Sequence, residues 1–147
     1  MNKKSLTNIG ILIAILALSL VGMVSPAATG IVDTVSPTTP LVSDEGSWTD
    51  SRTTLSFWWV PSYASSGIVE YLYAITEDSP EGTLIRDWTS AGLNTEITAK
   101  DLNLKPDTTY YIGVKARGGA DQVSEIGYSD GIAIRDGRDA AKFGEVS

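Results

Sequence analysis

Apolar and polar side chains alternate strictly over residues 110–117, which is the pattern of a β-strand that buries one of its faces. The same period of two recurs over residues 53–60. Shorter alternating runs follow, separated by clusters of Gly, Pro, Asn, Asp and Ser. No amphipathic helix of useful length is indicated downstream of residue 36. We therefore predict an all-β fold for the body of the chain.

Seven short strands are predicted in this body. The first begins at Leu41 and Val42, and the others are expected at residues 53–60, 67–76, 83–90, 95–99, 110–117 and 128–134. In the run 67–76 the side chains predicted to face inward are Val69, Tyr71, Tyr73 and Ile75. Seven short strands in about 100 residues bury their apolar faces by packing as two sheets. The predicted fold class is a seven-stranded antiparallel β-sandwich.

The amino terminus predicts export. Lys3 and Lys4 precede an apolar run over residues 9–24, and a proline and small residues follow at positions 25–28, which is the layout of a secretory signal. Residues 1–27 are assigned to a signal peptide with a hydrophobic helix. An uncleaved membrane anchor is the alternative, since a span needs about 20 mainly apolar residues. Residues 28–35 are interpreted as a linker, 36–136 as the folded domain and 137–147 as a C-terminal tail, in a secreted or cell-surface protein.

Composition excludes several classes of function. The chain has no cysteine and no histidine, so disulfides, thiol nucleophiles, imidazole bases and zinc sites built on Cys or His are ruled out. Its 11 basic and 18 acidic residues give a formal net charge of −7. Nucleic acid is not expected as a partner, because phosphate binding needs clustered Lys and Arg. Membrane contact is expected only through the N-terminal segment, if that segment stays uncleaved. No cofactor or metal is expected.

One short motif carries a resemblance to a known family. Leu104, Pro106, Thr108 and Tyr110 have the spacing Leu-x-Pro-x-Thr-x-Tyr. In sandwich folds a tyrosine at such a corner turns its hydroxyl back to a backbone group a few residues upstream. In this motif and in the order of the strands before it, the chain resembles the fibronectin type III family, and in particular its prokaryotic secreted or surface type. The resemblance covers about residues 36–136.

The resemblance implies that the sandwich is of the immunoglobulin-like type, and it also implies a core and a function. The residues assigned to the structural core are Leu55, Phe57, Trp59, Tyr71, Leu104, Pro106, Tyr110, Ile112 and Val114. Domains of this family commonly serve as non-catalytic interaction or spacer modules of exported proteins. The expected partner is therefore a protein or a glycan of the cell envelope.

Three tryptophans are candidates for ligand contact. Trp48, Trp58 and Trp88 are predicted to point outward, where aromatic rings can stack on sugars or anchor a protein interface. A carbohydrate-binding module is thus an alternative function. Packing against neighbouring strands would explain the same residues without a ligand.

Two further alternatives rest on carboxylates. Asp44, Glu45, Asp50 and Asp130 lie in turn-rich stretches and could supply oxygen ligands for calcium, although their spacing matches no EF-hand loop. A pair of carboxylates could also act as acid and base, or as acid and nucleophile, in a glycoside hydrolase. Nothing in the sequence places two of them in a cleft, so the chain is not expected to be an enzyme.

Overall fold

The computed structural model describes residues 33–138. The predicted signal peptide, most of the predicted linker and most of the predicted tail lie outside this part of the chain. Among the described residues, no helix has the length and apolar character to cross a membrane. The fold is all-β, as the alternating runs predict.

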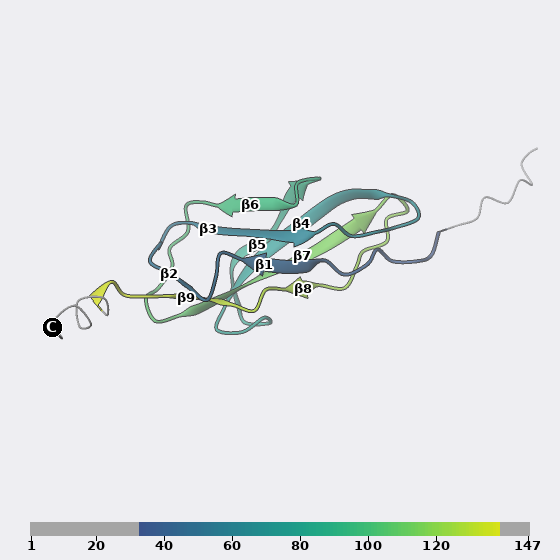
Figure 1. Ribbon diagram of the computed structural model, residues 1–147. Helices are drawn as coiled ribbons and strands as arrows, with labels where there is room; N and C mark the ends of the chain where they lie inside the picture. The colour runs from purple at the N-terminus through teal and green to yellow at the C-terminus, as the bar shows by residue number, and fades with distance from the viewer. Residues whose placement is uncertain (1–32, 139–147) are drawn as a thin grey trace, which may run out of the picture. The chain divides into compact units, whose positions relative to one another are not determined.

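Residues 33–138 form nine strand segments in two sheets (Figure 1). The strands are β1 (Leu41–Asp44), β2 (Trp48–Thr49), β3 (Leu55–Val60), β4 (Ile68–Glu77), β5 (Thr83–Gly92), β6 (Glu96–Ala99), β7 (Thr109–Gly118), β8 (Gly127–Tyr128) and β9 (Ile132–Ile134). The small sheet has the order β1-β3-β6, and the large sheet has the order β2-β9-β7-β4-β5, with β8 pairing to β7.

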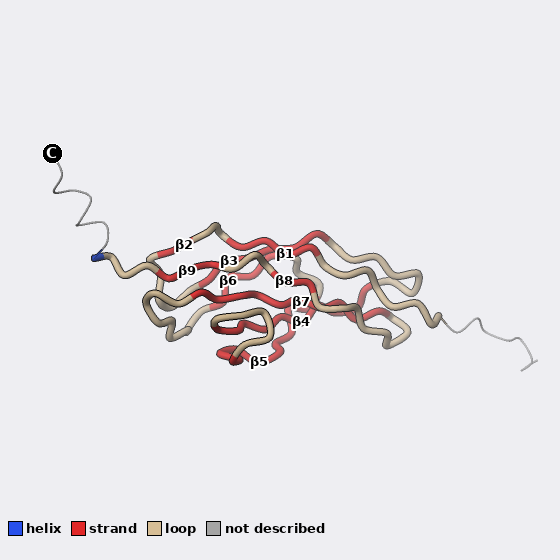
Figure 2. The backbone as a smooth tube through the Cα atoms, turned by 90° about the horizontal axis from the view of Figure 1, so that it is seen from below, coloured by secondary structure: helices blue, strands red, loops and turns tan. Residues whose placement is uncertain are grey.

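The core lies between the inner faces of the two sheets, whose strands Figure 2 shows from below. It is formed mainly by β3 from the small sheet and by β4 and β7 from the large sheet. Its larger buried side chains are Leu55, Phe57, Trp59, Tyr71, Tyr73, Ile75, Leu104, Tyr110, Ile112, Val114, Ile132 and Ile134. Aromatic rings meet across the layers, with centroid distances of 5.2 Å for Phe57–Tyr73 and 5.4 Å for Trp59–Tyr71. Such tilted ring pairs add to the stability that burial provides.

Tyrosine hydroxyls fix the backbone at two places. The hydroxyl of Tyr110 accepts a hydrogen bond from the backbone N–H of Lys105 at 2.9 Å, which is the tyrosine corner that the motif predicts. The hydroxyl of Tyr71 accepts one from the backbone N–H of Ser62, also at 2.9 Å. Both rings are buried, so each hydroxyl receives the partner that a buried polar group needs.

The assignment of Pro106 to the core is wrong, because Pro106 is exposed. It lies in the connection from β6 to β7, where Lys105 and Asp107 are also exposed. Connections between the sheets run over the surface. Proline can restrict the backbone of such a connection through its fixed φ without being buried.

The structure also corrects the prediction of seven antiparallel strands. The first strand is divided into β1 and β2, which belong to different sheets, and Gly46 between them has a φ of 130°. The last strand is divided into β8 and β9 around Gly131, whose φ is 97°. Residues with side chains rarely adopt these backbone angles, so glycine at both positions permits the break.

One strand pair is parallel. Strand β2 runs alongside β9, with Trp48 opposite Ala133 and Thr49 opposite Ile134. Two backbone hydrogen bonds join these segments, from Ala133 N–H to the Ser47 carbonyl at 3.1 Å and from Arg135 N–H to the Thr49 carbonyl at 3.0 Å. The large sheet therefore places the second strand of the described chain beside the last one.

Val69 does not face inward as predicted. The pairing of β4 with β7 shifts register between Ile68 and Glu70, which marks a β-bulge. The extra residue leaves Val69 exposed, while Ile68 packs against the core. The two-residue period of β4 is restored from Tyr71 onward, where Tyr71, Tyr73 and Ile75 are buried.

Candidate functional site: the outer faces of the two sheets

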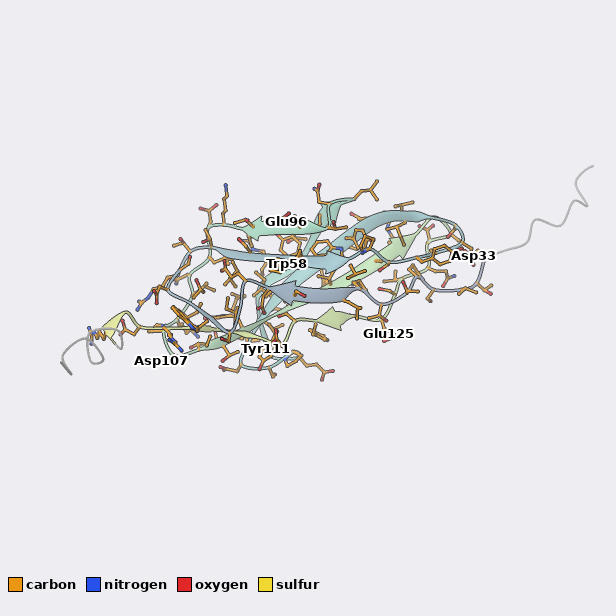
Figure 3. The ribbon with its side chains drawn as sticks, viewed as in Figure 1. Asp33, Trp58, Glu96, Asp107, Tyr111 and Glu125 are labelled. Atoms are coloured by element: carbon orange, nitrogen blue, oxygen red, sulfur yellow. The ribbon has the colours of Figure 1, made fainter. Side chains whose placement is uncertain are left out.

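Trp58 lies in the middle of the outer face of the small sheet. It alternates with the buried residues Phe57 and Trp59 on β3, and it is 45% exposed. Its cross-strand neighbours are Ser43 on β1 and Glu96 on β6. Figure 3 shows Trp58 and Glu96 on these neighbouring strands. In the described part of the chain, no other aromatic ring and no cationic group stacks on Trp58.

The other two candidate tryptophans each carry a cation. The guanidinium of Arg135 lies 4.2 Å from the ring centroid of Trp48, and the ammonium of Lys115 lies 4.0 Å from that of Trp88. These are cation–π contacts, which occupy one face of each ring. Trp48 is nevertheless 44% exposed, whereas Trp88 is half-buried. The three tryptophans predicted to contact a ligand are therefore in three different environments.

The outer face of the large sheet has a floor of small residues. Ala74 and Thr76 on β4 point away from the core and are still buried. Gly113 on β7 is buried as well, and a Cβ atom placed on it would lie 3.0 Å from Tyr128 Cε1 and 3.2 Å from Ile126 Cγ2. Tyr128 and Ile126 therefore cover the sheet over Gly113. A larger residue at position 113 would require these covering side chains to shift.

A hollow of about 260 Å³ opens beside this cover. It is lined by Ala74, Thr76, Pro80, Glu81, Gly82, Leu84, Trp88, Gly113, Ile126 and Tyr128. One wall is the turn between β4 and β5, held in place by the Thr76 hydroxyl, which donates to the carbonyls of Ser79 and Pro80 at 2.8 and 3.2 Å. Leu84 on β5 is 49% exposed. The large sheet thus presents a mostly apolar depression to solvent.

A second hollow follows the free edge of β6 in the small sheet. It measures about 580 Å³ and is lined by Leu93, Asn94, Thr95, Glu96 and Thr98. The backbone N–H of Trp59 donates to the Thr95 carbonyl at 2.9 Å, so the backbone groups of Thr95 face β3. Because these groups alternate along a strand, those of Glu96 and Thr98 point away from β3. This hollow is therefore polar.

The acidic side chains of residues 33–138 do not gather at one point. Among residues 33–138, no three acidic side chains are close enough to hold a metal ion, so the candidate calcium ligands do not converge. Asp44 is buried, and its Oδ1 accepts a hydrogen bond from the backbone N–H of Gly46 at 3.2 Å. Each of the two hollows contains one carboxylate, Glu81 in the first and Glu96 in the second. Neither hollow offers the pair that glycoside hydrolysis requires.

Several charged groups instead serve local structure. The carboxylate of Asp33 accepts hydrogen bonds from the Ser65 hydroxyl at 2.7 Å, from the Val35 N–H and from the Ser66 N–H. These bonds favour the charged form and lower the pKa of Asp33. The ammonium of Lys105 lies 2.6 Å from Glu77, and this hydrogen bond raises the pKa of Lys105. Both contacts fix connections at the ends of the strands.

Comparison with known proteins identifies the architecture. No protein-family model and no curated protein matches the chain. Among solved structures, titin kinase with its flanking domains is similar at a TM-score of 0.55 and 18% identity, covering 74% of this chain and 19% of that one. The C. elegans twitchin kinase region, described as Fn31-NL-kin-CRD-Ig26, is similar at a TM-score of 0.51 and 16% identity, covering 69% and 17%. Module A71 of human titin is 25% identical at a TM-score of 0.49, covering 73% and 96%.

The fold is fibronectin type III/immunoglobulin-like. The likeness to the two kinase-containing structures concerns fold alone, and this chain spans less than a fifth of the length of each.

The hollow on the large sheet was not found by sequence reasoning. Its floor depends on outward-pointing residues that are small, Ala74 on β4 and Gly113 on β7. Small residues at outward positions of two neighbouring strands are the sequence signal that could have indicated it. The segment that covers them, residues 126–128, comes from elsewhere in the chain, and the alternation of a single strand carries no information about it.

Proposed function

We propose that this protein is a non-catalytic interaction or spacer module that acts outside the cytoplasm, as part of a secreted or cell-surface protein of the prokaryotic fibronectin type III type. The apolar hollow on the outer face of the large sheet carries this proposal. It is open to solvent and lies on a closed sandwich whose backbone is held by two tyrosine hydroxyls. A rigid scaffold with an exposed apolar depression suits binding better than chemistry.

The partner that suits this hollow is a protein that inserts an apolar side chain flanked by basic residues. Leu84, Trp88 and Tyr128 supply apolar contact area for the inserted group. The turn that forms one wall carries Asp78 and Glu81, and the whole chain has a net charge of −7. Opposite charge on the partner would speed association and fix its orientation.

Capture of the partner with matched bait variants tests the proposal. The wild-type protein and the variants Leu84→Glu and Val35→Glu are immobilised and exposed to extracts of the native cell envelope. Leu84 and Val35 are both exposed, but only Leu84 lines the hollow. A partner bound by wild type and by Val35→Glu, and lost with Leu84→Glu, supports the proposal. Equal capture by all three baits contradicts the assignment of this surface.

Export is supported by Lys3 and Lys4 ahead of the apolar run at residues 9–24. Mass spectrometry of the protein recovered from its native cells tests it. A mature chain that begins at Ala28 is the expected result, and retention of residues 1–27 in a membrane fraction would favour the anchor. An intact chain in the cytosolic fraction would contradict the location.

A further inference from the structure

We propose that the outer face of the small sheet binds a neutral oligosaccharide, with Trp58 as the stacking platform. This site lies on the opposite layer from the hollow near Trp88 and does not depend on the proposed protein partner. A sugar ring has an apolar face and a polar rim. A site for it therefore needs an exposed aromatic ring beside an array of hydrogen-bonding groups.

The strand register places polar groups directly around the Trp58 ring. Because Trp59 and Thr95 form a hydrogen-bonded pair, Trp58 and Glu96 form the adjacent non-hydrogen-bonded pair, in which side chains lie closest. The next such pair is Ser56 with Thr98, whose hydroxyl oxygens are 3.0 Å apart. Both pairs point outward from the sheet, so a carboxylate and two hydroxyls lie on one side of the ring.

The polar hollow along β6 continues this array. Glu96 and Thr98 belong to both the outer face and the hollow, which connects the ring to the exposed backbone groups of β6. Asn94 lines the hollow with its amide, whose nitrogen donates to the Ala91 carbonyl at 3.0 Å, so its oxygen remains to accept a bond. Sugar hydroxyls both donate and accept, and they match this mixture of groups.

An apolar strip lies on the other side of the ring. Val60 is two residues along β3 from Trp58 and is exposed, and its cross-strand partner Leu41 is exposed as well. The face therefore changes from apolar at Leu41 and Val60 to polar at Glu96 and Thr98. An amphipathic ligand longer than one sugar ring can use both halves.

Charge selects a neutral sugar over an acidic one. Glu96 is the nearest ionisable neighbour of Trp58 across the strands, and the described part of the chain places no cation on this ring. With a net charge of −7 on the whole chain, uronate or sulfate groups would be repelled. Trp48 and Trp88 differ because Arg135 and Lys115 already occupy a face of each ring.

Affinity electrophoresis of the full chain tests the site. Gels contain hydroxyethylcellulose, glycol chitin or, as the anionic comparison, polygalacturonate, and migration is compared for wild type, Trp58→Ala and Trp48→Ala. Trp48 is the matched control because it is almost equally exposed but lies in the other sheet. We expect retardation in at least one neutral polymer, a loss of affinity of about tenfold or more with Trp58→Ala, as for other aromatic anchors, and little change with Trp48→Ala.

Two results would overturn the proposal. One is unretarded migration of the wild type in both neutral polymers. The other is retardation that Trp48→Ala weakens as much as Trp58→Ala does. Thermal melts of each variant establish that it is folded, and Glu96→Gln supplies a second variant that leaves the ring in place. Equal capture of the partner by all three baits would contradict the proposed protein-binding surface but leave these electrophoresis outcomes unchanged, so the two proposals fail separately.

Discussion

The outer faces of the two sheets follow the same two-residue alternation but differ in burial. On β3 of the small sheet, buried Leu55, Phe57 and Trp59 alternate with residues that are exposed or half-buried. On β4 of the large sheet, burial is continuous from Tyr73 to Thr76. Segments distant in sequence cover one outer face and leave the other open.

The difference shows that an outward-pointing residue can belong to a second, smaller packed layer. On the large sheet, Ile126 and Tyr128 pack over Gly113, and an apolar hollow remains beside them. On the small sheet, no segment within residues 33–138 covers Trp58 in this way. The first arrangement suits insertion of an apolar side chain, and the second suits stacking of a planar or ring-shaped ligand.

The largest expected change in stability is the difference between substituting a core-facing and an outward-facing tryptophan of β3. Trp59→Ala is expected to reduce the free energy of unfolding by about 3–5 kcal/mol, because a buried aromatic ring is lost and a cavity remains. Trp58→Ala is expected to change it by less than about 1 kcal/mol, because the ring is half exposed. Guanidinium melts of both variants measure the contrast. Equal losses would show that the outer face of the small sheet is packed after all.

The next largest expected change in stability comes from placing a valine on the outer face of each sheet. Gly113→Val is expected to destabilise the domain by about 1–3 kcal/mol, because its side chain would collide with Tyr128 and Ile126. Ser56→Val places the same side chain on the open face of β3 and is expected to stay within about 0.5 kcal/mol of wild type. Urea melts of the pair provide the measurement. If Gly113→Val is as stable as wild type, Ile126 and Tyr128 can move aside at little cost in free energy.

A smaller loss of stability is expected when the hydroxyl of one of two neighbouring tyrosines on β7 is removed. Tyr110→Phe removes the acceptor of the Lys105 N–H and is expected to lower stability by about 1 kcal/mol. Tyr111→Phe is the control, since Tyr111 points to the outer face and is half-buried. Paired thermal melts are suitable. If both variants melt with the wild type, the corner hydrogen bond contributes no net stability.

The smallest expected change in stability concerns Asp33, which lies on neither outer face, and it depends on pH. Hydrogen bonds from Ser65 and from the Val35 and Ser66 N–H groups lower the pKa of Asp33 in the folded state. Its contribution is therefore fully present above the unfolded pKa of about 3.9 and is lost as the pH falls through the lower folded pKa. We expect Asp33→Asn to melt slightly below wild type at pH 7. The gap should narrow as the pH falls through the folded pKa, and a gap that does not change on acidification would contradict the assignment.

The sequence predicts the inner layer of this fold better than its outer layers. Alternation on β3 and β7 and the spacing of Leu104 and Tyr110 indicate the all-β fold and the tyrosine corner, because each is a local pattern with one physical explanation. The bulge that turns Val69 outward depends on pairing with β7, which a single strand does not reveal.

The candidate sites are less predictable for the same reason. The exposure of Trp58 follows from alternation, but the cations on Trp48 and Trp88 come from Arg135 and Lys115, which are distant in sequence. The exposed position of Pro106 shows that a sequence motif does not reveal which of its residues are buried. A residue typical of a motif can act through its backbone angles alone, without contributing to the core.

The parallel pair of β2 and β9 has a mechanical consequence. Asp33 and the segment after β9 lie at opposite ends of the sandwich (Figures 1 and 3). A pull on these two ends would load the hydrogen bonds from Ala133 to Ser47 and from Arg135 to Thr49 in shear. Bonds loaded in shear share the force and must break together, whereas bonds that are peeled apart break one at a time. A pull from Asp33 reaches the pairing of β1 with β3 first, and the short pair of β2 and β9 would then share in resisting the extension of a tethered module.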